Sequence, residues 1–256
     1  MSDSSPRRVL LSWSSGKDSA WALHVLRRQP HVELVGLITT FNEAADRVAM
    51  HAVRRALVEQ QAASARLPLW RVDLPHPCSN TDYEARMRAL IERARAAGVT
   101  GIAFGDLFLE DVRDYRLRMM AGTGLDAMFP LWGAPADTPA LARTMIGGGL
   151  KAVLTCVDPG QLDERFVGRA FDDELLAELP AGADPCGERG EFHSFCWDGP
   201  MFAWPIEVES GEIVRRDGFT FIDVRPTGAH RIVEGPEVVL RVEDRYAADH
   251  QDRRRG

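Results

Sequence analysis

Residues 9–28, VLLSWSSGKDSAWALHVLRR, decide the fold. The apolar run Val9–Ser12 predicts a buried strand, and Ala20–Arg28 has the apolar spacing of an amphipathic helix. Between them lies the polar turn Ser14–Ser19, which reads SSGKDS. A small-residue turn at the start of a helix exposes backbone N–H groups beside the positive end of the helix dipole, which suits a phosphate group. The sequence therefore predicts a phosphate-binding loop at this turn.

Two charged residues in the turn strengthen this prediction. Lys17 supplies a fixed positive charge, and Asp18 can hold a magnesium ion that bridges phosphates. The turn is not a Walker A loop, because Leu11 stands where that motif needs its first glycine and Asp18 where it needs serine or threonine. An ordinary serine-rich helix cap is the alternative, and the strand–turn–helix context favours the phosphate loop.

The chain around this motif alternates strands and helices. From Arg8 to about Trp132, short β-branched runs are followed by runs with helical spacing, which is typical of βαβ units on a parallel sheet. The further strands expected here are 32–40, 69–72 and 100–105, and the further helices are 47–66, 81–97 and 110–120. The pattern predicts an α/β fold whose N-terminal domain contains a Rossmann-like parallel sheet.

A second region begins near residue 130, where the texture of the sequence changes. A strand is expected at 150–155, and two extended runs follow at 201–208 and 212–224, joined by Ser210–Gly211, which has hairpin chemistry. We expect three parts, which are an α/β domain at 1–130, a smaller α+β domain at 131–225 and a polar tail at 226–256. Edge strands of the second domain leave a homodimer open.

Length, charge and cysteine usage exclude several classes of protein. The 256 residues suffice for one large or two modest domains, and a net charge of −7 argues against a broad nucleic-acid-binding surface. No run approaches the ~20 apolar residues of a membrane span, and no apolar segment follows the N-terminal arginines, so we expect a cytoplasmic protein. The four cysteines, which contain no CxxC pair, are expected to be reduced thiols. They are Cys78, Cys156, Cys186 and Cys196.

The SSGKDS turn resembles the SGGKDS motif of the PP-loop ATP pyrophosphatases, with Ser15 in place of the first glycine of the pair. Enzymes of that family split ATP into AMP and pyrophosphate by adenylating an oxygen atom, and a nitrogen or sulfur nucleophile then displaces AMP. The resemblance implies a HUP-type (adenine nucleotide alpha hydrolase-like) N-terminal domain that binds ATP and Mg²⁺. It also implies that the second domain binds the substrate.

Three further segments narrow the resemblance to the diphthine–ammonia ligase branch, over residues 8–225. Gly105–Arg116 is similar to that branch's segment after the fourth strand, Pro130–Trp132 matches its PLW, and Gly187–Phe195 resembles its GE-x-GE-[FY]-x-[ST]-F. Two other segments, 42–51 and 77–80, are similar to a bacterial subgroup. Diphthamide is made on the elongation factor 2 of archaea and eukaryotes, so the acceptor of a bacterial-type relative need not be diphthine.

The residues and the resemblance together give candidate site residues. The expected ATP-binding residues are Ser12, Ser14, Ser15, Gly16, Lys17, Asp18, Ser19, Thr40 and Gly105. The expected catalytic residues are Lys17, Asp18, Asp106, Glu188 and Glu191, with Asp18 as the Mg²⁺ ligand. The expected substrate-binding residues are Asn42, Arg113, Arg116, Gly187 and Glu188.

Position along the chain supports some of these assignments. Asp106 follows a predicted strand and so lies at the sheet edge where ligands of open α/β folds bind. Arg113 and Arg116 share a helix face and can clamp an anion, unless that face is simply solvated. Glu188 and Glu191 lie in a glycine-rich segment and can bind magnesium or ammonium, unless they are ordinary acidic turn residues.

These observations favour an ATP-dependent amide ligase that adenylates a carboxylate acceptor and uses ammonium as the nitrogen source. The acceptor, a small molecule or a protein, stays unknown. Two alternatives remain open, which are a sulfur-transfer enzyme acting on tRNA and a non-catalytic sensor of ATP or AMP. The sulfur-transfer alternative would need reactive cysteines and a basic RNA-binding surface.

Overall fold

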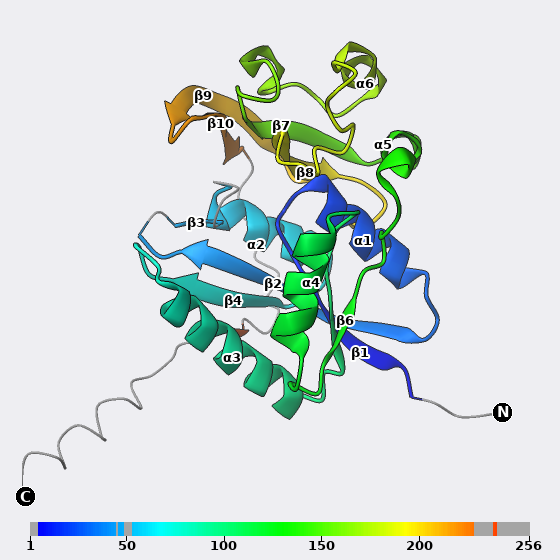
Figure 1. Cartoon of the computed structure of the whole chain (residues 1–256), viewed down its shortest axis with the longest axis vertical. Coiled ribbons are helices and arrows are strands. Elements are labelled where there is room, and N and C mark those ends of the chain that lie inside the picture. Colours follow the sequence, from blue (N-terminus) through cyan, green and yellow to red (C-terminus); the bar gives the residue numbers. More distant parts are fainter. Residues whose placement is uncertain (1–4, 45, 49–52, 228–237, 240–256) are drawn as a thin grey trace, which may run out of the picture.

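The computed structural model describes residues 5–44, 46–48, 53–227 and 238–239. The larger of its two sheets contains β1 (Arg7–Ser12), β2 (Val32–Asn42), β3 (Arg47–Val48), β4 (Leu69–Leu74), β5 (Gly101–Ala103), β6 (Asp126–Met128) and β11 (Val238–Val239). Its strand order is β11-β4-β2-β1-β5-β6, and all of these pairs are parallel, whereas β3 pairs with β2 antiparallel. The predicted parallel α/β sheet is therefore confirmed (Figure 1).

Strand β1 lies in the centre of the larger sheet because its side chains are apolar on both faces. Val9, Leu10 and Leu11 are completely buried. Val9 and Leu11 belong to one hydrophobic cluster and Leu10 to another, as expected when alternate side chains point to opposite faces of a sheet. Helices cover both faces, as is typical of buried parallel sheets.

Four helices connect the strands of the larger sheet. They are α1 (Lys17–Arg27), α2 (Arg55–Ser64), α3 (Asn80–Ala96) and α4 (Glu110–Met120). Helix α3 starts with a capping box in which Ser79 and Asp82 satisfy each other's backbone N–H groups. The expected helices at 81–97 and 110–120 are confirmed to within a residue.

The expected helix at 47–66 is wrong in its first part. Arg47–Val48 pair with Phe41–Asn42 as a short antiparallel strand, and α2 begins only at Arg55. The Arg47 and Arg54 side chains bind the carboxylate of Asp223 in a distant strand. This tertiary ion pair, with the β2–β3 pairing, overrides the local helical spacing.

Chain order places the ligand-binding edge of the larger sheet. From β1 the chain moves outward through β2 to β4, and it returns to the other side of β1 with β5. The carboxyl ends of β1 and β5 are thus the topological switch point, where ligands of open α/β sheets bind. The SSGKDS turn follows β1 and Asp106 follows β5, so both lie at this point.

The smaller sheet is antiparallel, with the order β8-β7-β10-β9. Its strands are β7 (Lys151–Val157), β8 (Phe192–Asp198), β9 (Val208–Arg216) and β10 (Phe219–Pro226), and α5 (Thr138–Gly147) and α6 (Asp173–Glu178) accompany it. The hairpin turn is Asp217–Gly218, not Ser210–Gly211, because both turn residues take positive φ (53° and 85°), as a two-residue hairpin requires. The expected strand at 201–208 is also wrong, since β9 starts at Val208, and β8 was not predicted.

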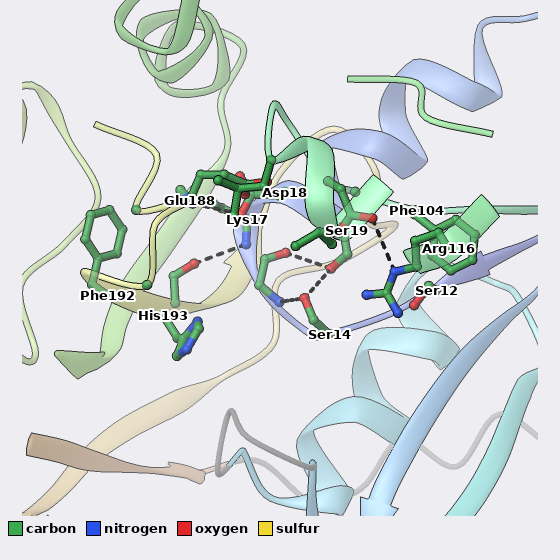
Figure 2. Close-up of a pocket in the computed structure, with 18 residues that line it drawn as sticks. Ser12, Ser14, Lys17, Asp18, Ser19, Phe104, Arg116, Glu188, Phe192 and His193 are labelled. Atoms are coloured by element: carbon green, nitrogen blue, oxygen red, sulfur yellow. Dashed lines mark hydrogen bonds and ion pairs between the residues drawn. The ribbon is translucent and has the colours of Figure 1, made fainter. Parts of the chain in front are cut away.

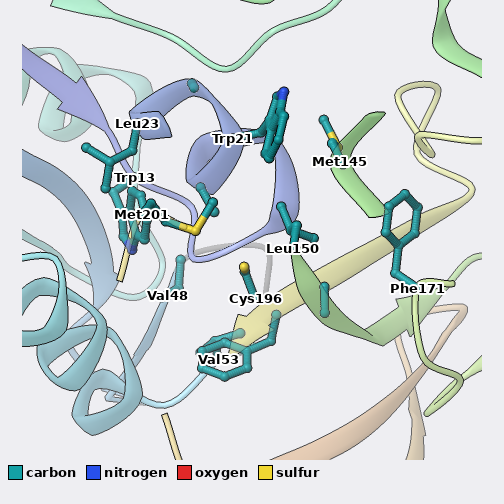
Figure 3. Close-up of a cluster of buried hydrophobic side chains, with 14 of the residues drawn as sticks. Trp13, Trp21, Leu23, Val48, Val53, Met145, Leu150, Phe171, Cys196 and Met201 are labelled. Carbon is teal, nitrogen blue, oxygen red and sulfur yellow. The ribbon is translucent and has the colours of Figure 1, made fainter. Parts of the chain in front are cut away.

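The two sheets share one hydrophobic core. Trp13 and Trp21 from the N-terminal part pack in the same cluster as Leu150, Phe171 and Cys196 from the C-terminal part (Figure 3). The predicted boundary near 130 falls between β6 in the larger sheet and α5 beside the smaller one. Within the predicted tail, Val238–Val239 pair with β4, so at these two residues the chain is part of the sheet. No helix in the described part of the chain has the length and apolar run needed to cross a membrane.

Candidate active site

The SSGKDS turn forms the start of α1, as predicted. Gly16 is the residue before the helix, and helix α1 begins at Lys17. Strand β8 of the smaller sheet packs directly against this turn, because the Lys17 N–H donates to Ser194 Oγ at 3.2 Å. A Cβ atom on Gly16 would lie 3.1 Å from the Ser194 carbonyl oxygen, so this close approach favours glycine. The loop is therefore held between the two sheets.

A cavity of about 250 Å³ opens beside this loop. Eleven of the predicted site residues line it, namely Ser12, Ser14, Gly16, Lys17, Asp18, Ser19, Gly105, Asp106, Arg116, Gly187 and Glu188. They come from three distant parts of the chain, which meet at the carboxyl ends of β1 and β5. Figure 2 shows Lys17, Asp18 and Glu188 grouped together, with Arg116 and Phe104 farther along the cavity.

Lys17 is buried and charged. Its Nζ donates to Asp18 Oδ2 at 2.9 Å and to the Cys186 carbonyl oxygen, and it lies 5.3 Å from the centre of the Phe192 ring. Burial alone would lower the pKa of Lys17, but the nearby Asp18 carboxylate outweighs that effect and raises the pKa above its ordinary value. A fixed positive charge therefore lines the cavity.

Asp18 has one carboxylate oxygen bound and one free. Oδ2 accepts from Lys17, whereas Oδ1 is buried without a hydrogen-bond partner among the described residues. Burial raises the pKa of Asp18, and Asp184 adds to the increase while Lys17 opposes it. A buried oxygen without a partner is costly unless a ligand satisfies it. Asp18 is therefore the residue of this cavity best prepared to receive a cation.

The fit of this site to Mg²⁺ depends on what else supplies oxygen ligands. No group of three or more His, Cys, Asp or Glu side chains within the described ranges could hold a metal ion by itself. Mg²⁺, however, is usually bound by one or two carboxylates together with substrate phosphates and water. Asp18 beside a phosphate-binding loop fits that arrangement.

Glu188 faces Lys17 and Asp18 from the loop before β8. Its Oε1 accepts a hydrogen bond from the Leu107 N–H at 2.8 Å. Burial raises the pKa of Glu188 to about 7, and the Asp18 carboxylate contributes to this increase. A carboxyl group that titrates near neutral pH can both accept and donate a proton, as a general acid–base residue must.

Glu191 lies outside the cavity and binds the backbone instead. Its two carboxylate oxygens accept hydrogen bonds from the N–H groups of Asp184 and Arg189, and the side chain is 2% exposed. These bonds fold the segment between Asp184 and Glu191 into the turn that presents Glu188. We therefore assign Glu191 to positioning rather than to catalysis.

The two predicted arginines have different surroundings. Arg116 lines the cavity and donates from Nε to Asp106 Oδ2 at 3.3 Å, so its charge is already partnered. Arg113 lies outside the lining, with its guanidinium 4.7 Å from the Trp132 ring centre and 5.5 Å from that of Phe129. Within the described part of the chain, Arg113 forms no ion pair. The two do not form the symmetric clamp that their spacing suggested.

The other predicted residues lie near the cavity but not in its lining. Ser15 is completely buried, with a positive φ of 71°. Thr40 and Asn42 are at the carboxyl end of β2, where Asn42 Oδ1 accepts from the Ala44 N–H. The structure therefore brings neither Thr40 nor Asn42 into the cavity.

Sequence reasoning missed seven residues of the lining, namely Phe104, Leu109, Val112, Gly190, Phe192, His193 and Ser194. Ser194 was quoted only as part of a motif, and His193 was given no role. Burial lowers the pKa of His193 to about 4, and nearby Lys17 lowers it further, so the ring is neutral at physiological pH. The alternating pattern of strand β8 could have shown that His193 and Ser194 point to opposite faces.

The cysteines are not arranged for sulfur chemistry. Cys156, Cys186 and Cys196 are buried, and burial raises the pKa of the Cys156 thiol to about 12. Burial likewise raises the pKa of Cys186, although its neighbour Lys17 opposes the increase. Cys78 is exposed and is not part of the cavity lining. Buried thiols with raised pKa values are poor nucleophiles.

Comparison with known proteins agrees with this site. The family described as "Diphthamide synthase N-terminal domain" matches residues 7–126, and "Diphthamide synthase C-terminal domain" matches residues 137–227. Proteins named diphthine–ammonia ligase are similar over 85% of this chain. Those of Homo sapiens and Bos taurus are 26% identical with 88% of their length covered, and that of Danio rerio is 27% identical with 92% covered. On these matches, the chain belongs to the diphthamide synthase family.

Proposed function

We propose that this protein is an ATP-dependent amide ligase that adenylates a carboxylate and transfers ammonia to it. The observation that carries the proposal is one cavity in which the N-terminus of α1, Lys17 and Asp18 face Glu188. The similarity to diphthine–ammonia ligases supports the same chemistry. In the first step, a carboxylate oxygen of the acceptor attacks the α-phosphorus of ATP, and the bond from that phosphorus to the bridging oxygen breaks to release pyrophosphate.

The phosphate loop binds and orients ATP in this mechanism. Backbone N–H groups at the start of α1 and the positive end of its dipole attract the phosphates. Lys17 stabilises the negative charge that develops on the departing pyrophosphate, and its raised pKa keeps it protonated throughout. Asp18 would hold Mg²⁺, which neutralises phosphate charge when it is bound.

Glu188 prepares the nitrogen nucleophile in the second step. Ammonium has no free electron pair, so it must lose a proton before it attacks the acyl carbon and displaces AMP. The pKa of Glu188 near 7 suits a group that accepts this proton at neutral pH. Leu107 N–H orients the carboxylate by binding its Oε1. The products are then the amide and AMP.

Arg113 is the residue that we assign to the acceptor. Its charge lacks an ion-pair partner among the described residues, and two aromatic rings hold the guanidinium in place. Val112, its neighbour on α4, lines the cavity. An arginine held in this way is suited to bind an anionic group of an acceptor. We further propose that the parts 1–130 and 131–225 supply the ATP site and the acceptor site, and that the acceptor need not be diphthine.

Product analysis tests the proposal. Purified protein is incubated with ATP, Mg²⁺, ammonium and an extract of the source cells, and the nucleotide products are separated. We expect AMP and pyrophosphate that depend on the extract. Lys17→Met should abolish the reaction, whereas Lys151→Met is a matched control, because Lys151 is the other lysine of the chain and is exposed. ADP and phosphate as products would overturn the proposal, and tight ATP binding without turnover would favour the sensor.

A further inference from the structure

Gln61 of helix α2 is polar, yet it is completely buried. We infer that Gln61 is a positioning residue that holds the Ser15–Gly16 peptide in the orientation needed for phosphate binding. The inference rests on the proposed function in one respect, which is that ATP is the ligand of the loop. It assigns to α2 a part in nucleotide binding, although no residue of α2 lines the cavity.

Gln61 joins three separate segments through its side-chain amide. Its Oε1 accepts a hydrogen bond from Trp13 Nε1 at 2.8 Å. Its Nε2 donates to the Ser15 carbonyl oxygen at 3.0 Å and to the Cys196 carbonyl oxygen at 2.6 Å. Trp13 follows β1, Ser15 is in the phosphate loop and Cys196 is in β8, and Figure 3 shows Trp13 and Cys196 in one buried cluster. Both amide hydrogens are therefore used.

These bonds determine which way the Ser15–Gly16 peptide points. The Ser15 carbonyl oxygen also accepts from the Cys196 N–H at 2.9 Å, so two donors hold it toward the protein interior. In a planar trans peptide the C=O and N–H groups point in opposite directions. The Gly16 N–H must therefore point away from Gln61, and Gly16 lines the cavity. A peptide flip would turn a carbonyl oxygen toward the phosphates instead.

The loop needs such support because Ser15 is in an unfavourable conformation. Its φ of 71° lies in the left-handed region, which non-glycine residues avoid. Its Oγ is buried and has no hydrogen-bond partner among the described residues, so the side chain does not compensate. Conformations of this kind persist only where the surroundings impose them. Here the bonds from Gln61 and from the Cys196 N–H do so.

The test is a double-mutant cycle on ATP binding, measured by calorimetry with ATP and Mg²⁺ but without an acceptor. The variants are Gln61→Met, Ser15→Gly and the two together. Gln60→Met is the matched control, because Gln60 is the adjacent residue of the same helix and none of the bonds described above involves it. Thermal unfolding of each variant sets a temperature at which all of them are folded.

We expect Gln61→Met to weaken ATP binding about tenfold or more, and Gln60→Met to leave it within about twofold. Glycine adopts a positive φ without strain, so in the Ser15→Gly background the loss should shrink to about threefold. Unchanged ATP affinity in Gln61→Met, or an equal loss in both backgrounds, would overturn the inference. If Gln61→Met does not fold, Gln61→Asn, which shortens the side chain, takes its place in the cycle with the same criteria. Failure of the unaltered protein to bind ATP would instead overturn the proposed function.

Discussion

Replacing Glu188 by glutamine tests whether this carboxyl group is protonated in the folded protein near neutral pH. Glutamine keeps an oxygen that can accept the Leu107 N–H and removes the charge. Burial and the neighbouring Asp18 raise the pKa of Glu188 from 4.5 to about 7. The folded state therefore binds more protons than the unfolded state between these two pH values. Stability must then fall as pH rises through this window, because the carboxylate has to ionise in a buried site.

The size of the effect follows from the pKa of Glu188. A difference of one pKa unit corresponds to 1.36 kcal/mol, so between pH 5 and pH 8 the unaltered protein should lose about 2–3 kcal/mol relative to Glu188→Gln. Urea unfolding of both proteins at the two pH values measures this difference. We expect Glu188→Gln to gain in relative stability at pH 8 and to show little of that gain at pH 5.

A matched substitution separates this effect from a general loss of negative charge. Glu84 is exposed on helix α3, so Glu84→Gln should show the same stability difference at both pH values. If the difference between the unaltered protein and Glu188→Gln is independent of pH, Glu188 has an ordinary pKa. A variant that is less stable than the unaltered protein at pH 8 would show that the folded state favours the carboxylate, and either result would refute the reasoning.

Three further predictions concern the loop and its supports. Ser15→Gly relieves a left-handed residue at the expense of a more flexible unfolded chain, so it should stabilise the protein by about 0.5–1 kcal/mol; a lower unfolding temperature would contradict this. Gly105→Ala would place a Cβ atom 3.1 Å from the Ser19 backbone nitrogen, so we expect ATP affinity to fall about tenfold or more while the circular dichroism spectrum is unchanged. Although partial burial of Asp223 opposes the effect, hydrogen bonds from Arg54, Arg225 and Arg47 lower its pKa well below the ordinary value of 3.8. The stability that this carboxylate contributes is present above pH 4 and is lost in more acidic solution, so Asp223→Asn should cost about 2 kcal/mol at pH 7 and much less near pH 2, as urea unfolding at both pH values would show.

Local patterns were sufficient to predict much of the larger sheet. Strand β1 and helix α4 follow from apolar runs and helical spacing, because both are decided by side chains close together in the sequence. Strand β3 and the start of α2 do not, since β3 pairs with β2 and Arg54 is drawn to Asp223 in β10. The hairpin was misplaced because Ser210–Gly211 and Asp217–Gly218 both have turn chemistry, and only strand pairing chooses between them.

The candidate site divides in the same way. Lys17, Asp18 and Asp106 could be found from the sequence, because a strand and the turn that follows it place them at one edge of a sheet. The difference between Glu188 and Glu191 could not, although they are three residues apart. One faces Lys17 in the cavity, and the other binds the N–H groups of Asp184 and Arg189.

By itself, the sequence determined the parallel sheet, the phosphate loop at the start of α1 and the family of the chain. Each of these depends on apolar periodicity or on a contiguous motif, which local chemistry specifies. Only the tertiary structure decided that β8 closes the loop, that Gln61 holds the Ser15 carbonyl and that Asp106 neutralises Arg116. These contacts join residues far apart in the sequence, and their energies depend on burial and distance, which no local pattern records.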